Sequence, residues 1–120
     1  MTIFALSSGP GISGVAVIRI SGPKTKDVIK EITGKLLPKP REATLRKVKQ
    51  NKTKELIDEC ILIWFPGPNS YTGEDMAEIH AHGSRAVIKS ILDCISKIDT
   101  CRLAEPGEFT KIAFQNEKIN

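Results

Sequence analysis

The chain contains 120 residues, a length that suits one domain with its own hydrophobic core. Hydrophobic residues account for 40% and charged residues for 27%, and the formal net charge is +4, an ordinary balance for a globular protein in water. The sequence has no apolar run long enough to span a bilayer and no basic-then-apolar signal pattern at its start. We therefore expect a single soluble domain without a membrane partner.

Two strands separated by a glycine-rich segment are predicted at the start of the chain. Residues 2–6 and 15–20 have the apolar and β-branched side chains that favour strands. Between them, Gly9, Gly11 and Gly14 match the G-x-G-x-x-G fingerprint of dinucleotide-binding proteins. That fingerprint requires a helix after the last glycine, whereas a strand pattern follows here, and the lysine and hydroxyl residue of a P-loop are also missing. We interpret the glycines as a turn and not as a nucleotide site.

A basic segment follows the second strand. Apolar residues at helical spacing predict a helix that ends at Gly34, and a polar strand is predicted at 44–49. Residues 24–54 hold 11 lysines and arginines against three acidic residues, a charge of +8, which leaves seven against 11, or −4, for the rest. Such a block could attract RNA phosphates, but it contains no aromatic residues on which bases could stack, which favours a solvated basic face.

The middle of the chain predicts a buried strand, a long loop and an amphipathic strand. Residues 60–65 are apolar on both faces, which is typical of a central strand that is covered on both sides. Two prolines and two glycines exclude regular structure from residues 66–75, and a loop of this length is a candidate site. Polar and apolar residues then alternate over residues 76–82.

The last third of the chain predicts a helix, a short strand and a final helix. The first helix opens at Ser84 and has apolar residues at helical spacing, the strand covers 102–104, and the last helix ends near Phe114. Strands outnumber helices in this order. The expected fold class is α+β, with a mixed β-sheet and two to three helices.

Glu78, His80 and His82 share one face of the predicted strand at 76–82. Two imidazoles and a carboxylate are reasonable ligands for zinc, although side chains two residues apart on a strand diverge. Alternatively, Glu78 faces a pocket and accepts two parallel hydrogen bonds from adjacent N–H donors, such as those of an amino-pyrimidinone ring. A solvent-facing Glu78 is the third interpretation.

Arg19 and Lys118 are the cationic candidates. Arg19 shares a strand face with Val15 and Val17, and a guanidinium there could hold a carboxylate or phosphate, or could simply be exposed at an edge. Lys118 lies at the end of the chain, where fraying is the usual expectation.

Three cysteines occur without a C-x-x-C pair: Cys60, Cys94 and Cys101. An odd and sparse count is typical of reduced thiols in the cytoplasm and not of a disulfide framework or a zinc site. Since all three lie in apolar surroundings, packing is their expected role.

Three stretches taken together closely resemble the N-terminal domain of the bacterial tRNA-modification GTPases called MnmE or TrmE. They are PGPNSYTGEDMAEIHAHG (66–83), GVAVIRISG (14–22) and AEPGEFTKIAFQNEK (104–118), and their order and spacing agree across nearly the whole chain. The chain departs from the usual family pattern at Ser13, Ser84, Glu105, Ile112 and Gln115. The last three of these surround Lys118.

This resemblance implies a fold similar to the folate-binding aminomethyltransferase (GcvT-like) module. It implies that residues 1–120 form a single folate-binding and dimerisation domain, with 5-formyl-tetrahydrofolate held by Arg19, Glu78 and Lys118. Family members modify the wobble uridine of tRNA (a 5-carboxymethylaminomethyl-type modification) with a flavoprotein partner, MnmG (GidA). The family's GTP, Mg²⁺ and K⁺ belong to a GTPase domain that this chain lacks, as it lacks the helical domain, so the chain alone is expected to be inactive.

Two other functions remain open from the residues alone. A stand-alone RNA-binding module built on the basic segment 24–54 would bind tRNA with a steep salt dependence and would not respond to folate. A metalloenzyme built on Glu78, His80 and His82 would contain stoichiometric metal.

Overall fold

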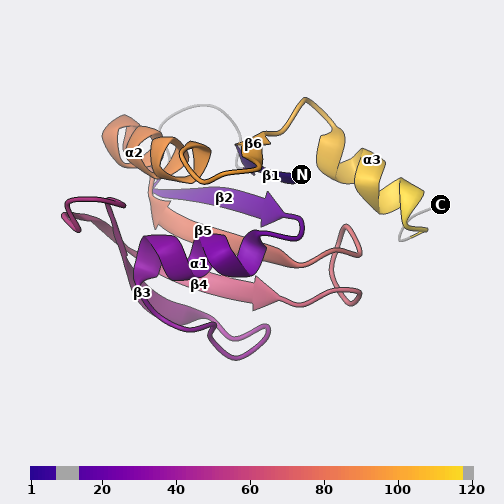
Figure 1. Ribbon diagram of the computed structural model, residues 1–120, viewed down its shortest axis with the longest axis horizontal. Helices are drawn as coiled ribbons and strands as arrows, with labels where there is room; N and C mark the ends of the chain where they lie inside the picture. The colour runs from indigo at the N-terminus through magenta and orange to yellow at the C-terminus, as the bar shows by residue number, and fades with distance from the viewer. Residues whose placement is uncertain (8–13, 118–120) are drawn as a thin grey trace.

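The computed structural model of the chain describes residues 1–7 and 14–117. Four residues singled out by their sequence context, Gly9, Gly11, Ser13 and Lys118, lie outside the described residues. Residues 1–7 and 14–117 form a mixed six-stranded sheet with three helices (Figure 1), which confirms the predicted α+β class.

The strand order across the sheet is β3-β4-β5-β2-β1-β6. Neighbouring strands are antiparallel except β1 and β6, which are parallel. The strands are β1 (Thr2–Leu6), β2 (Val15–Ser21), β3 (Thr44–Lys49), β4 (Leu56–Phe65), β5 (Met76–His82) and β6 (Cys101–Leu103). This arrangement places β5 and β2, which carry Glu78 and Arg19, at the centre of the sheet.

Helices α1 (Thr25–Thr33) and α2 (Arg85–Ser96) pack on one face of the sheet, while α3 (Glu108–Gln115) lies beside it (Figure 1). Local sequence sets their ends. The Ser84 hydroxyl accepts a hydrogen bond from the Val87 N–H at 3.2 Å and caps α2. Gly34, with φ of 68°, ends α1 in the left-handed conformation that glycine adopts at low cost. None of the described helices is long and apolar enough to cross a membrane.

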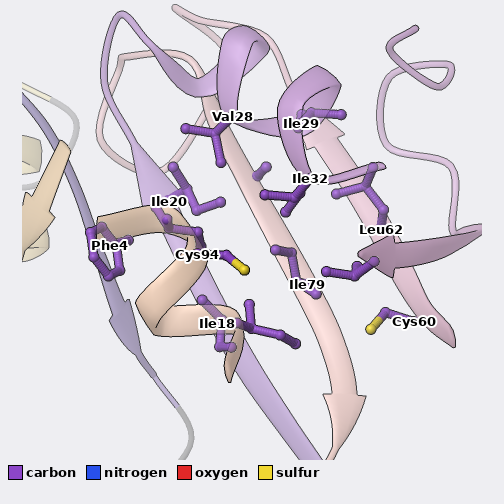
Figure 2. Close-up of a cluster of buried hydrophobic side chains, with 14 of the residues drawn as sticks. Phe4, Ile18, Ile20, Val28, Ile29, Ile32, Cys60, Leu62, Ile79 and Cys94 are labelled. Carbon is purple, nitrogen blue, oxygen red and sulfur yellow. The ribbon is translucent and has the colours of Figure 1, made fainter. Parts of the chain in front are cut away.

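The hydrophobic core lies between the two helices α1 and α2 and the sheet face they cover (Figure 2). Because side chains alternate between the two faces of a strand, every second residue of the central strands points into this core: Ile18 and Ile20 come from β2, and Ile79 comes from β5. Cys60 and Cys94 are buried within the core and Cys101 packs at its margin, all three as free thiols. The predicted packing role of the cysteines is confirmed.

Residues 60–65 form a strand within β4, as predicted, but the prediction that this strand is covered on both sides is wrong. Cys60, Leu62 and Trp64 are buried in the core, but Ile61, Ile63 and other alternate residues of β4 are only half-buried. The reason is architectural, because both packed helices lie on the same face of the sheet. The opposite face stays partly open, and it carries the polar candidates.

Candidate functional site

Arg19 and Glu78 lie opposite each other on the open face of the sheet. They are direct partners in the antiparallel register of β2 and β5. Arg19 Nη2 donates to Glu78 Oε2 at 3.2 Å, and the two side chains are 30% and 20% exposed. Alternation puts both on this face because Ile18, Ile20 and Ile79 occupy the buried one. The strand-face predictions for both residues are therefore confirmed, and the pair forms the centre of the candidate site.

The two histidines of β5 engage different carboxylates. His80 Nε2 lies 3.0 Å from Glu78 Oε1, whereas His82 Nδ1 lies 2.7 Å from Asp58 Oδ1 on β4. Asp58 also accepts the backbone N–H of His82 at 2.9 Å. In the part of the chain that is described, no three metal-ligating side chains converge, so the strand E-x-H-x-H pattern does not assemble a metal centre there.

Asp58 and Cys60 form a second polar cluster, which the sequence did not indicate. Burial alone would raise the pKa of Asp58, but hydrogen bonds from the backbone and ring of His82 and from the Cys60 thiol hold it below its usual range. Burial, together with the nearby Asp58 charge, raises the pKa of Cys60 to about 12. The thiolate is the reactive form and the side chain is buried in the core, so we expect Cys60 to act as a packing residue and not as a nucleophile.

Two aromatic rings flank the Arg19 guanidinium. Arg19 Cζ lies 5.7 Å from the centre of the Tyr71 ring and 5.9 Å from that of Phe109. Both distances fall within the range of cation–π attraction. Arg19 Nε is buried and has no hydrogen-bond partner among residues 1–7 and 14–117, so within these residues one donor of the guanidinium is left unsatisfied. An unpaired buried donor costs on the order of 1–3 kcal/mol, which a bound acceptor would recover.

The loop at residues 66–75 and helix α3 hold these rings in place. The Tyr71 hydroxyl lies 3.0 Å from Thr110 Oγ1 on α3. Asn116 Nδ2 donates to the Thr72 carbonyl oxygen at 2.8 Å, and Thr72 Oγ1 lies 2.8 Å from Ser21 Oγ at the end of β2. The middle of the loop thus contacts α3 on one side and the end of β2 on the other, and it connects α3 to the strand that carries Arg19.

The predicted cationic residue Lys118 lies outside the described residues, so its place at the site stays a prediction. Asn116, two residues earlier, is anchored on the loop that carries Tyr71. The described chain therefore approaches the Arg19 side of the sheet at its end.

An ion pair fixes the start of α3. Arg102 Nη1 and Nη2 donate to the two carboxylate oxygens of Glu108 at 2.8 and 2.5 Å, and the Glu105 N–H donates to Glu108 at 2.9 Å. The hydrogen bond from Arg102 is the main reason that the pKa of Glu108 is lowered to about 2. A bidentate pair restricts orientation as well as distance. Sequence reasoning missed it, because nothing in the local pattern joins Arg102 to Glu108.

The hydrogen-bonding groups of the site suit a flat polar ligand. Glu78 presents two oxygens, each with a lone pair left after the contacts to Arg19 and His80. Arg19 offers an unpartnered N–H, and two aromatic rings stand next to it. A separate hollow of about 330 Å³ lies beside His80 on the same face. This donor and acceptor set fits a ring with adjacent N–H groups that also carries a carbonyl or carboxylate.

Comparison with known proteins gives a consistent family. Residues 2–118 match the family model described as "GTP-binding protein TrmE N-terminus". The chain is 66% identical over 120 residues to the tRNA modification GTPase MnmE of Pelagibacter ubique, covering 100% of this chain and 27% of that protein. It is 50% identical over 119 residues to the tRNA modification GTPase MnmE of Rickettsia akari, covering 99% of this chain and 27% of that protein.

A eukaryotic relative is similar over the same region. The mitochondrial 5-taurinomethyluridine-[tRNA] synthase subunit GTPB3 of Danio rerio is 47% identical over 119 residues, covering 99% of this chain and 24% of that protein. The chain thus spans about a quarter of the length of the curated relatives it matches.

Proposed function

The chain belongs to the TrmE N-terminal family, and from this premise we propose that it is the tetrahydrofolate-binding and dimerisation domain of a GTPase that modifies the wobble uridine of tRNA. The observation that carries the folate proposal is the pair formed by Arg19 and Glu78 on the open face of the sheet, flanked by Tyr71 and Phe109. A similarity of the fold to folate-binding aminomethyltransferase modules is part of this proposal.

The proposed ligand is 5-formyl-tetrahydrofolate, which would supply a one-carbon unit when bound. Its pterin ring carries adjacent N–H donors, and the carboxylate of Glu78 has two acceptor oxygens for them. The unpartnered Nε of Arg19 would donate to an oxygen of the ligand, and Lys118 would supply a second cationic contact. Tyr71 and Phe109 would exclude water from the ring, which strengthens each of these hydrogen bonds.

A calorimetric titration with 5-formyl-tetrahydrofolate tests this proposal. We expect saturable binding by the native chain. Glu78→Ala should weaken the binding free energy by about 1.5–3 kcal/mol, which raises Kd tenfold or more, since hydrogen bonds to a charged group are of that strength. The matched control is Glu42→Ala, which removes an exposed carboxylate from the connector before β3. If both variants weakened folate binding equally, Glu78 would not be a folate contact.

Dimerisation is proposed through the open face of the sheet. Ile61, Ile63 and Phe65 of β4 are half-buried there, and Val15 at the start of β2 is 53% exposed. Large apolar side chains on a partly open sheet face are typical of a surface that a second copy covers. Sedimentation equilibrium should give a dimer for the native chain and a monomer for Ile61→Glu, whereas a native monomer at high concentration would contradict this part of the proposal.

The remaining properties of the complete family protein are proposals for the chain as well. GTP, Mg²⁺ and K⁺ would be bound by its GTPase domain, and an MnmG (GidA)-type flavoprotein and tRNA would be its partners in the cytoplasm. A GTPase assay on this chain alone should detect no turnover, and turnover would place a nucleotide site within residues 1–120.

A further inference from the structure

The basic segment 24–54 carries cations that form almost no ion pairs with other described residues. Of its 11 lysines and arginines, only Lys24 has a carboxylate within 4 Å in the described structure, that of Asp27 at 3.8 Å. In contrast, the cations elsewhere in the chain include Arg19, Lys89 and Arg102, which all form ion pairs. The excess of +8 is therefore not neutralised within the fold.

These cations gather at one edge of the sheet. The segment consists of α1, a connector, β3 and the turn that follows, and α1 packs against β3, which is the edge strand. A hollow of about 400 Å³ lies at this edge, and four of its lining residues are cationic against one carboxylate, that of Glu59. The four are Lys35, Arg46, Lys47 and Lys49.

Protection of the edge strand is the simplest rival explanation. Lysines on an edge strand prevent it from pairing with strands of other molecules, and exposed Lys47 would serve that role. Arg46 does not fit this explanation. Its side chain is half-buried. Among the described residues, its Nε is buried without a hydrogen-bond partner and Nη1 reaches only the Leu45 carbonyl oxygen, at 3.4 Å. A partly desolvated guanidinium with unused donors indicates a binding site for an oxyanion.

The arrangement favours a polymer of phosphates over a single anion. Beyond the hollow, Lys52 and Lys54 follow in the turn after β3, and both are exposed. Since no tyrosine, tryptophan or phenylalanine occurs in residues 24–54, the surface offers no platform for unstacked bases. Cations without aromatic residues are suited to the backbone of a base-paired nucleic acid, which presents closely spaced phosphates.

We propose that the β3 edge binds the phosphate backbone of structured RNA, with Lys35, Arg46, Lys47 and Lys49 as the central contacts. The choice of tRNA as that RNA rests on the proposed function, because relatives of the chain are named as tRNA-modification proteins. The surface lies on a different strand from Arg19 and Glu78, so RNA and folate would bind independently.

The test is the affinity of the chain for an unmodified tRNA transcript at several salt concentrations. The double variant Lys47→Ser/Lys49→Ser should bind at least about tenfold more weakly at low salt, and the slope of log K against log [salt] should fall by about 2, one for each lost phosphate contact. The control is Arg85→Ser/Lys89→Ser, which removes the same charge from exposed positions on α2 and should leave the slope nearly unchanged.

Three results would overturn the inference. The first is no binding of tRNA by the native chain, and the second is an equal loss of tRNA affinity in the two double variants. The third is that polyglutamate at matched charge competes with tRNA as effectively as unlabelled tRNA does, which would indicate a surface for acidic proteins. A folate titration of Lys47→Ser/Lys49→Ser separates the two proposals, since unchanged folate binding alongside lost RNA binding supports both. If the chain binds tRNA at this edge but not folate, the folate proposal alone fails.

Discussion

Gly22 occupies the junction where β2 ends and α1 begins, and its replacement by alanine should be costly. Its φ of 139° lies in the range that favours glycine, and a Cβ there would lie 2.7 Å from both Cα and Oγ1 of Thr2. Thr2 cannot move easily, because it is fully buried. Its Oγ1 accepts the Lys24 N–H at 2.7 Å and its own N–H donates to the Thr100 carbonyl oxygen at 3.0 Å.

The expected magnitude combines two effects. Positive φ in a residue with a Cβ costs about 1–3 kcal/mol, and overpacking a rigid site costs a further 1–3 kcal/mol or so. Gly22→Ala should therefore lower the free energy of unfolding by about 3 kcal/mol or more, after the small gain from a stiffer unfolded chain. With a denaturant slope of about 1.5 kcal/mol/M, the urea midpoint should fall by roughly 2 M.

Two other glycines separate these effects in the same urea assay. Gly34 has a φ of 68°, but the Cβ of an alanine there would have no atom within 4 Å, so Gly34→Ala should show only the backbone cost, about 1 kcal/mol. Gly14 has neither constraint, and Gly14→Ala should change the stability by less than about 0.5 kcal/mol. If Gly22→Ala were no more destabilising than Gly34→Ala, the junction would be able to relax, and the argument from close contact with Thr2 would be refuted.

Three further predictions concern the packing and the charges. Arg102→Ala should raise the pKa of Glu108 from about 2 toward its ordinary value of 4.5, which carboxyl-carbon NMR can follow. In the native protein, the ion pair stabilises the fold above pH 4.5, and this contribution is lost as the pH falls toward 2. Cys60, with its pKa raised to about 12, should resist alkylation at pH 8 until urea unfolds the chain, as read by mass spectrometry. Ile79→Ala should cost about 3–4 kcal/mol in a urea titration and Ile61→Ala, on the open face, much less in the monomer.

Much of the fold could be predicted from periodicity and from glycine and proline. The alternation in β2 and β5 predicted that Arg19 lies on the strand face opposite Ile18 and Ile20, and Glu78 on the face opposite Ile79; the structure places these isoleucines in the core. Sequence could not show that β2 and β5 are neighbours with these two residues in register, since strand order depends on long-range pairing.

The error over β4 has the same origin. An apolar strand face is compatible with cover by a helix in the same chain or with an open surface, and only the positions of α1 and α2 distinguish these cases. Ile61 and Ile63 therefore looked like core residues and lie on the open face. The aromatic rings at Arg19 were missed because Tyr71 and Phe109 come from a loop and a helix far apart in sequence.

The central claim is that the Arg19–Glu78 pair is a folate site, and a crystal structure of the chain with 5-formyl-tetrahydrofolate tests it most directly. The account predicts the pterin ring against Glu78, with its N–H donors on the carboxylate and with Tyr71 and Phe109 beside Arg19. A ligand bound instead in the hollow of about 800 Å³ that Asn51 and Lys97 line on another part of the molecule would contradict it.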